Sequence, residues 1–117
     1  MSEFLSQIQG LVAKGEVRVS AHGYDEIAAD GILVREVVDG LKDAQVVEEY
    51  PEFPKGPCLL VLQRDHKGNP IHVVWGTPKG ASSPAVVVTA YQPDPDRWTE
   101  DFLRKRHESQ TLYEAGA

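Results

Sequence analysis

The chain has 117 residues, of which 41% are apolar and 26% are charged, proportions typical of a single globular domain. It carries 12 lysines and arginines against 18 aspartates and glutamates, a formal net charge of −6. This balance argues against a protein that coats polyanions, because phosphate binding requires clustered cations. The acidic excess lies in residues 1–50, with ten acidic and four basic residues, whereas residues 51–117 hold eight of each.

Two features of the sequence bear on its cellular compartment. Cys58 is the single cysteine, so no disulfide can form within the chain, as is common in a reducing compartment. Residues 1–10 lack the basic and long apolar regions of a signal peptide. No apolar run approaches the roughly 18 residues that a membrane-spanning helix needs. We therefore expect a cytoplasmic protein that does not enter a membrane.

Three helices are predicted at the start of the chain. The first has an apolar stripe at helical spacing and ends near Gly15; the stripe consists of Phe4, Leu5, Ile8, Leu11 and Val12. Ser20 is a favourable N-cap for a second helix over residues 21–30, which Gly31 ends. The third helix is marked by the repeat of Val34, Val37, Val38 and Leu41.

The pattern then changes to β-strands. The predicted strands are Ala44–Tyr50, Cys58–Asp65, Pro70–Gly76 and Pro84–Tyr91. Residues 66–69 are turn-forming and join the second and third strands into a hairpin. Asp94 and Pro95 are typical of a helix start, so a last helix is expected from there to about His107. Residues 108–117 are expected to form a flexible tail.

Helices and strands are segregated along the chain, which is typical of the α+β class. We expect N-terminal helices packed on a four-stranded antiparallel sheet, with a C-terminal helix. No internal repeat or linker divides the sequence, so residues 1–107 are expected to form a single domain.

His22 is the first candidate for proton transfer. It lies just inside the second predicted helix, and Asp25 and Glu26 follow three and four residues later, within reach of its face. A nearby carboxylate favours the charged imidazole, and a histidine with an orienting acid is a common acid–base unit. The alternative is a surface histidine beside helix acids.

His72 lies in the third predicted strand. Strand alternation places His72 and Val74 on one face, and Ile71, Val73 and Trp75 on the other, which is the core face. We therefore expect His72 on the open face of the sheet, either as a solvated histidine or as a second functional one.

Other polar residues could act with these histidines. Arg64, near a strand end, and Arg18, before the second helix, could each bind phosphate bidentately or serve only as surface residues. Thr89 and Tyr91 alternate with Val87 on one face of the last strand. The Tyr91 hydroxyl can donate to an anion or a base, although tyrosine is also common in sheet packing.

Several known motifs are absent from the sequence. Residues 76–80 lack the Gly-Lys-Ser/Thr order of a phosphate-binding loop, and no Rossmann or Gly-x-Ser-x-Gly pattern occurs. One cysteine and four scattered histidines give no metal-ligand spacing, so we expect neither a metal nor a cofactor. Residues 104–106 form the one basic run, which either offsets a helix dipole or forms a phosphate-binding edge.

Several segments, taken in order, resemble the family called domain of unknown function 4258. They are Val19-Ser20-Ala21-His22, Gly31-Ile32, Val34–Leu41, Ile71-His72-Val73-Val74, Val87-Val88-Thr89-Ala90-Tyr91 and Gln92–Trp98. The resemblance spans residues 17–106. That family is similar to the RelE/ParE-like toxins, small α+β domains of which many cut RNA, so the resemblance implies RNA or an antitoxin-like protein as partner.

The resemblance also implies that His22, His72, Thr89 and Tyr91 line one open surface together. Metal-free RNA cleavage there would use the two histidines as proton carriers and Arg64 or Arg18 as the cation. Family members often carry arginine where this chain has Glu26 and Asp30, a change that reverses the local field. The alternative is therefore a non-catalytic relative that binds a protein through an exposed sheet face or edge.

Overall fold

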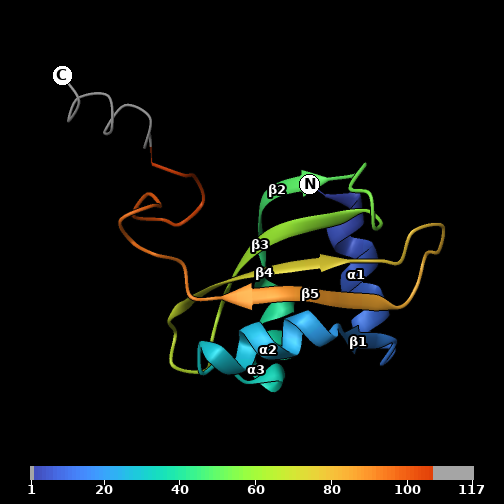
Figure 1. Ribbon diagram of the computed structural model, residues 1–117, viewed down its shortest axis with the longest axis horizontal. Helices are drawn as coiled ribbons and strands as arrows, with labels where there is room; N and C mark the ends of the chain where they lie inside the picture. The colour runs from blue at the N-terminus through green and yellow to red at the C-terminus, as the bar shows by residue number, and fades with distance from the viewer. Residues whose placement is uncertain (1, 107–117) are drawn as a thin grey trace.

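The computed structural model describes residues 2–106, so the tail expected at 108–117 lies outside the described residues. Helices pack on a five-stranded sheet (Figure 1). In chain order the elements are α1 (Glu3–Ala13), β1 (Val17–Val19), α2 (Ala21–Ala29), α3 (Val34–Gly40), a 3-10 helix (Leu41–Asp43), β2 (Gln45–Tyr50), β3 (Cys58–Arg64), β4 (Pro70–Gly76) and β5 (Ala85–Tyr91). The mixed α+β class and the three N-terminal helices are confirmed.

The sheet has the strand order β1-β5-β4-β3-β2. Strands β2 to β5 form the expected antiparallel meander. The prediction of a four-stranded, wholly antiparallel sheet was wrong, because β1 adds a fifth strand parallel to β5, with Val17 opposite Ala85. β1 has only three residues, too few for strand alternation to be recognised in the sequence.

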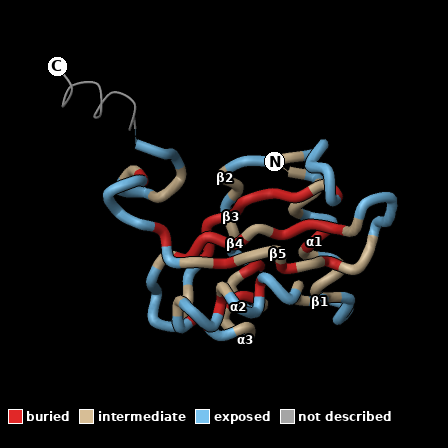
Figure 2. Tube along the Cα trace, viewed as in Figure 1, coloured by how far each residue is buried: buried red, intermediate tan, exposed pale blue. Residues whose placement is uncertain are grey.

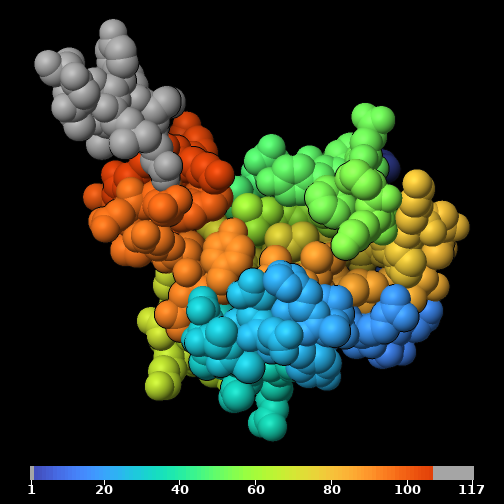
Figure 3. All heavy atoms as spheres, in the orientation of Figure 1, coloured from blue at the N-terminus to red at the C-terminus, as the bar shows by residue number. Residues whose placement is uncertain are grey.

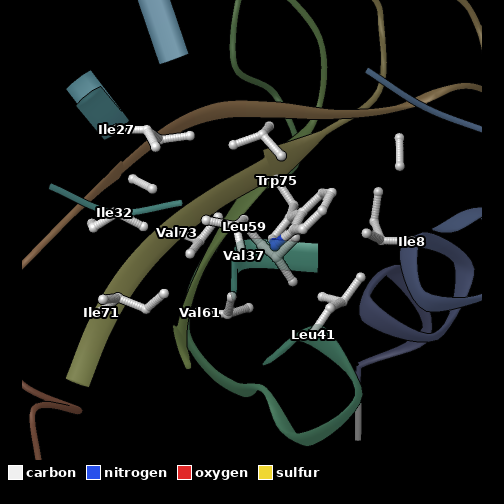
Figure 4. Close-up of a cluster of buried hydrophobic side chains, with 13 residues drawn as sticks. Ile8, Ile27, Ile32, Val37, Leu41, Leu59, Val61, Ile71, Val73 and Trp75 are labelled. Carbon is white, nitrogen blue, oxygen red and sulfur yellow. The ribbon is translucent and has the colours of Figure 1, made fainter. Parts of the chain in front are cut away.

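One face of the sheet carries the hydrophobic core (Figure 4). The fully buried Trp75 of β4 lies in this cluster, and Ile8 of α1, Ile27 of α2 and Val37 of α3 reach it from the helices. Figure 2 shows the buried residues concentrated along the central strands β3 and β4. The helices therefore cover this face, as the apolar alternation of β4 predicts.

A buried glutamine links the core to α3. Gln63 is only 2% exposed. Its side-chain nitrogen donates to the carbonyl of Val37 at 2.8 Å, and its oxygen accepts from Nε1 of Trp75 at 2.8 Å. Both ends of the amide are thus satisfied, which offsets the cost of burying a polar group.

Helix α2 lies along β5, beyond the end of the short strand β1 (Figure 1). Ser20 fixes its start, because the hydroxyl accepts from the backbone nitrogen of Gly23 and donates to the carbonyl of Val88. At its far end Asp30 accepts from the backbone nitrogen of Gln92 at 2.8 Å. A Cβ at Gly23 would lie 2.9 Å from the Val87 carbonyl oxygen, so glycine permits this close approach.

The predicted C-terminal helix was wrong. Residues 92–106, here called the C-terminal segment, form turns and a small loop closed by the bridge between Trp98 and Lys105. Asp94 starts it with a turn, accepting from the backbone nitrogen of Asp96. Thr99 then pairs with the backbone of Arg104. Side-chain hydrogen bonds of this kind compete with helical ones, so the N-cap signal did not produce a helix.

Candidate functional site

The sheet face opposite the core is the first candidate site, and we call it the open face. Strand pairing places on it Arg18, Leu60, Leu62, His72, Val74, Val86, Thr89 and Tyr91. Figure 3 shows this face, hollowed between the C-terminal segment, the stretch that follows β2, and α2. Strand pairing therefore puts five of the six residues singled out from the sequence for function on one face: His72, Thr89, Tyr91, Arg18 and, at the end of β3 opposite Pro70, Arg64.

His72 is on the open face but is buried, so the expectation of a solvated histidine was wrong. Its exposure is 0% because the C-terminal segment covers it. The Trp98 ring packs edge-on against the imidazole at a centroid distance of 4.4 Å, and the Tyr91 ring does so at 5.6 Å. Nε2 of His72 lies 2.8 Å from the carbonyl oxygen of Phe102.

The contacts of His72 define its protonation state. A carbonyl oxygen only accepts, so Nε2 donates to Phe102 and the proton of the neutral ring sits on Nε2. Nδ1 has no partner among the described residues. Burial lowers the pKa of His72, an effect that the hydrogen bond to Phe102 opposes only in part. His72 is therefore a neutral structural residue that holds the C-terminal segment on the sheet.

We expect this histidine to make the protein less stable in acid. Its folded pKa is below the unfolded value, so between the two the unfolded chain binds more protons, and the free energy of unfolding falls as pH drops below about 6.5. Urea unfolding at pH 7.5 and 5.5 measures this loss. His72→Gln cannot titrate and should show a smaller loss. An equal pH dependence in both proteins would contradict the assignment.

Tyr91 and Thr89 lie beside His72 through the register of β4 and β5, where Tyr91 pairs with His72 and Thr89 with Val74. A β-bulge shifts this register, so Val87 points to the core while Thr89 and Tyr91 face the open side. The expected alternation of all three on one face was therefore wrong. Burial raises the pKa of Tyr91, which keeps its hydroxyl protonated as a hydrogen-bond donor.

A cavity of about 350 Å³ adjoins Tyr91, between β2 and the C-terminal segment. Arg104 and Lys105 line it, and Glu48 is the one acidic residue among the described residues of its lining. The Tyr50 hydroxyl donates to Glu48 at 3.1 Å, and burial together with this carboxylate raises the pKa of Tyr50 to about 12. We call this space the tyrosine pocket.

A second cavity, of about 330 Å³, lies at the other end of the same face. Arg18 of β1, Lys55 from the stretch between β2 and β3, and Lys79 from the β4–β5 connection line it. Its walls include Val86, Val88 and several residues of the two connections: Phe53, Gly56, Pro57, Thr77 and Pro78. None of the described residues that line it is acidic. We call this space the cationic pocket.

The linings of the two pockets carry a charge opposite to that of the whole chain. Together they present five cations, Arg18, Lys55, Lys79, Arg104 and Lys105, against the single carboxylate of Glu48. The protein as a whole carries a net charge of −6. The linings of the two pockets can therefore attract an anion over a short range, although the chain as a whole is acidic.

His22 lies outside both pockets, at the start of α2. Its side chain is 70% exposed, and Nε2 lies 3.3 Å from Glu26. Asp30 lies one turn further along the same helix stripe and holds the end of β5 through Gln92. The acidic residues at the two positions where the resembled family often has arginine thus have local partners here.

Arg64 belongs to a different cavity, among the helices and the β3–β4 turn. This cavity, of about 660 Å³, is lined by α1, the end of α3 and the turn. His66 in the turn places Nε2 at 3.0 Å from Asp39. Acidic and basic residues alternate along its wall, including Asp43, Lys42 and Arg64 itself. Arg64 thus stands at the end of the open face, where it lines this cavity and neither of the two pockets.

Lys55, Lys79 and Phe53 were missed from the sequence as site residues. All three lie in connections between strands, where no periodicity shows which way a side chain points. The one sequence signal near them is Gly56, because the two connections pack so closely that only glycine fits at this position.

Residues 2–106 contain neither a cluster of metal-ligating side chains nor a helix that could cross a membrane. No three His, Cys, Asp or Glu side chains there are grouped to hold a metal ion. None of the helices described has the length and apolar character to cross a membrane.

Comparison with known proteins bears on this region. Residues 19–92 match the family described as Domain of unknown function (DUF4258), which confirms the resemblance seen in the sequence. The match contains His22, His72 and Tyr91, but excludes Arg18 and most of the C-terminal segment that buries His72. No curated protein and no solved structure matches the chain.

Proposed function

Since the chain belongs to the family described as Domain of unknown function (DUF4258), we propose that it is an RNA-binding relative of the RelE/ParE-like toxins. In this proposal single-stranded RNA lies across the open face, from the cationic pocket to the tyrosine pocket. The cytoplasm expected from the sequence is the compartment in which it would meet RNA.

The observation that supports the proposal is the charge of the two pockets on the open face. Five cations against one carboxylate line its two pockets, although the whole chain is acidic. A cationic groove with aromatic side chains is the usual means of binding single-stranded RNA without sequence preference. Phe53, 46% exposed, and Tyr24, 56% exposed, supply large exposed rings on the segments that border this face.

Binding without efficient cleavage is the form of this function that the geometry favours. Metal-free cleavage needs a base for the 2′-hydroxyl and an acid for the leaving oxygen. His72 is unsuited to either role because it is buried and its Nε2–H is used by Phe102. Of the histidines described, His22 is the one exposed beside this face, and its neighbours Glu26 and Asp30 repel a phosphate.

A protein partner that adds a strand to the sheet is less well supported. β2 is an edge strand, and the register shift between Val46 and Glu48 marks a bulge in its pairing with β3. Bulges and charged residues are common protections of an edge against strand addition, and Glu48 and Glu49 supply the charges.

RNA binding can be tested by fluorescence anisotropy with a labelled single-stranded RNA at several salt concentrations. Arg104→Ala with Lys105→Ala should weaken binding and lower the salt dependence, by about one in log–log slope per cation removed. The matched control, Lys42→Ala with Lys67→Ala, removes two cations that line neither pocket and should change binding little. Equal losses in both variants, or no binding by the wild type, would contradict the proposal.

The same RNA, followed by gel electrophoresis, tests cleavage. We expect little product over the time in which binding reaches equilibrium, and His22→Ala should leave binding intact. Rapid cleavage that His22→Ala abolishes would show a ribonuclease and overturn the binding-only form of the proposal.

A further inference from the structure

The cationic pocket is formed by two chain connections that pack tightly against each other. The backbone nitrogen of Thr77 donates to the carbonyl of Pro57 at 3.2 Å. Gly56 has a φ of +126°, and a Cβ on it would meet the Thr77 carbonyl and lie 2.7 Å from the Lys79 nitrogen. At Gly76 a Cβ would lie 2.6 Å from the Pro57 carbonyl oxygen. The backbone around this pocket is therefore closely fixed.

The charges of the pocket are unbalanced. Arg18, Lys55 and Lys79 form no ion pair with any other residue of the described range. A phosphodiester inside an RNA strand carries one negative charge, whereas a phosphomonoester carries about −1.5 to −2 near pH 7. Three cations around one small space match the phosphomonoester better. The guanidinium of Arg18 adds the bidentate geometry that suits phosphate oxygens.

The remaining surface of the pocket suits a flat, weakly polar group. Val86, Val88 and Pro78 form apolar walls, and the exposed ring of Phe53 lies at the rim. An aromatic ring stacks on any nucleobase, because every base presents a π-face. The volume of about 330 Å³ is at the lower end of small-molecule sites, which suits one nucleotide rather than an extended ligand.

From these features we infer that the cationic pocket binds a nucleotide that carries a phosphomonoester. In RNA such a group occurs only at a phosphorylated strand end, so the pocket would hold the end of the strand that the open face binds. This inference rests on the proposed function for its source of ligand, since a free mononucleotide offers the same chemistry. It assigns Lys55 and Lys79 to recognition of the phosphate and Phe53 to the base.

The test compares RNAs of one sequence with a 5′-phosphate, a 3′-phosphate or hydroxyls at both ends. We expect either the 5′-phosphorylated or the 3′-phosphorylated RNA to bind at least about tenfold more tightly than the RNA with two hydroxyl ends. One hydrogen bond to a charged group is sufficient for a difference of this size. Lys55→Ala with Lys79→Ala should bring this ratio to about one, whereas the control pair Lys42→Ala with Lys67→Ala should preserve it. Uridine monophosphate should displace the phosphorylated RNA, and uridine should not.

The possible outcomes separate this inference from the proposed function. If all three RNAs bind equally and the mononucleotide does not compete, the inference is wrong and RNA binding stands. If the mononucleotide binds through Lys55 and Lys79 but no RNA binds, the pocket is confirmed as a nucleotide site and the proposed function is wrong. If the ratio survives in the Lys55→Ala, Lys79→Ala protein, the phosphate is bound elsewhere and the inference fails.

Discussion

Trp75→Ala is expected to lower the free energy of unfolding by about 3–5 kcal/mol, the cost of removing a large buried aromatic side chain. Trp75 is 0% exposed and lies in the core cluster with residues from three helices. The substitution also leaves the side-chain oxygen of Gln63 without its partner. Domains of this size have total stabilities of about 5–15 kcal/mol. A large fraction of the Trp75→Ala molecules should therefore be unfolded at low urea concentrations.

Trp75→Phe is the matched control for this loss. It keeps an aromatic ring in the core but removes the indole N–H that Gln63 accepts, so it should cost about 1–3 kcal/mol for the unsatisfied amide, plus a smaller volume term. Urea midpoints by circular dichroism measure both variants. A cost below about 1 kcal/mol for Trp75→Ala would contradict the central position of this side chain.

Gly56→Ala is expected to abolish the preference for phosphorylated RNA ends while the core remains folded. The φ of +126° is nearly confined to glycine, and the added Cβ would collide with the backbone of Thr77 and Lys79. The connection that carries Phe53 and Lys55 must then move away from its neighbour. We expect a stability loss of about 1–3 kcal/mol from strain and a larger relative loss in nucleotide binding.

Gly80→Ala is the control for backbone strain without collision. Gly80 also has a positive φ, +77°, but a Cβ there would have no atom within 4 Å. It should cost about 1–2 kcal/mol and preserve the binding preference. Unfolding by urea and anisotropy with the phosphorylated RNA distinguish the two variants. If both glycine variants bind like the wild type, the tight packing of the connections has no role in the pocket.

The central parts of the fold could be predicted because their patterns are long. The four strands of the meander have six or seven residues each, and α2 has both its N-cap, Ser20, and its stop signal, Gly31, in the sequence. β1 was missed because three residues cannot show alternation. The last helix was wrongly expected because Asp94 and Thr99 direct their hydrogen bonds into turns, and Trp98 packs on His72 instead of on a helix face.

The candidate site was predictable only in part. Alternation correctly placed His72 on the face opposite Trp75, but the segment that buries it comes from residues far along the chain, so its neutral, structural role was hidden. Arg18 was named, yet its companions Lys55 and Lys79 are brought to it by connections whose paths no local pattern defines. The sequence thus identified residues that could act in a site, whereas the contacts that bring such residues together depend on long-range packing.

The parallel pairing of β1 with β5 has a consequence for how the chain folds. The meander joins neighbours in sequence, but the Ser20 hydroxyl must find a carbonyl 68 residues away. Such distant contacts carry a larger loop-closure entropy and form slowly. The cationic pocket needs Arg18 from β1, so it is complete only when β1 has paired with β5. A nucleotide would bind there only in the state in which β1 is paired with β5, and would stabilise that state by mass action.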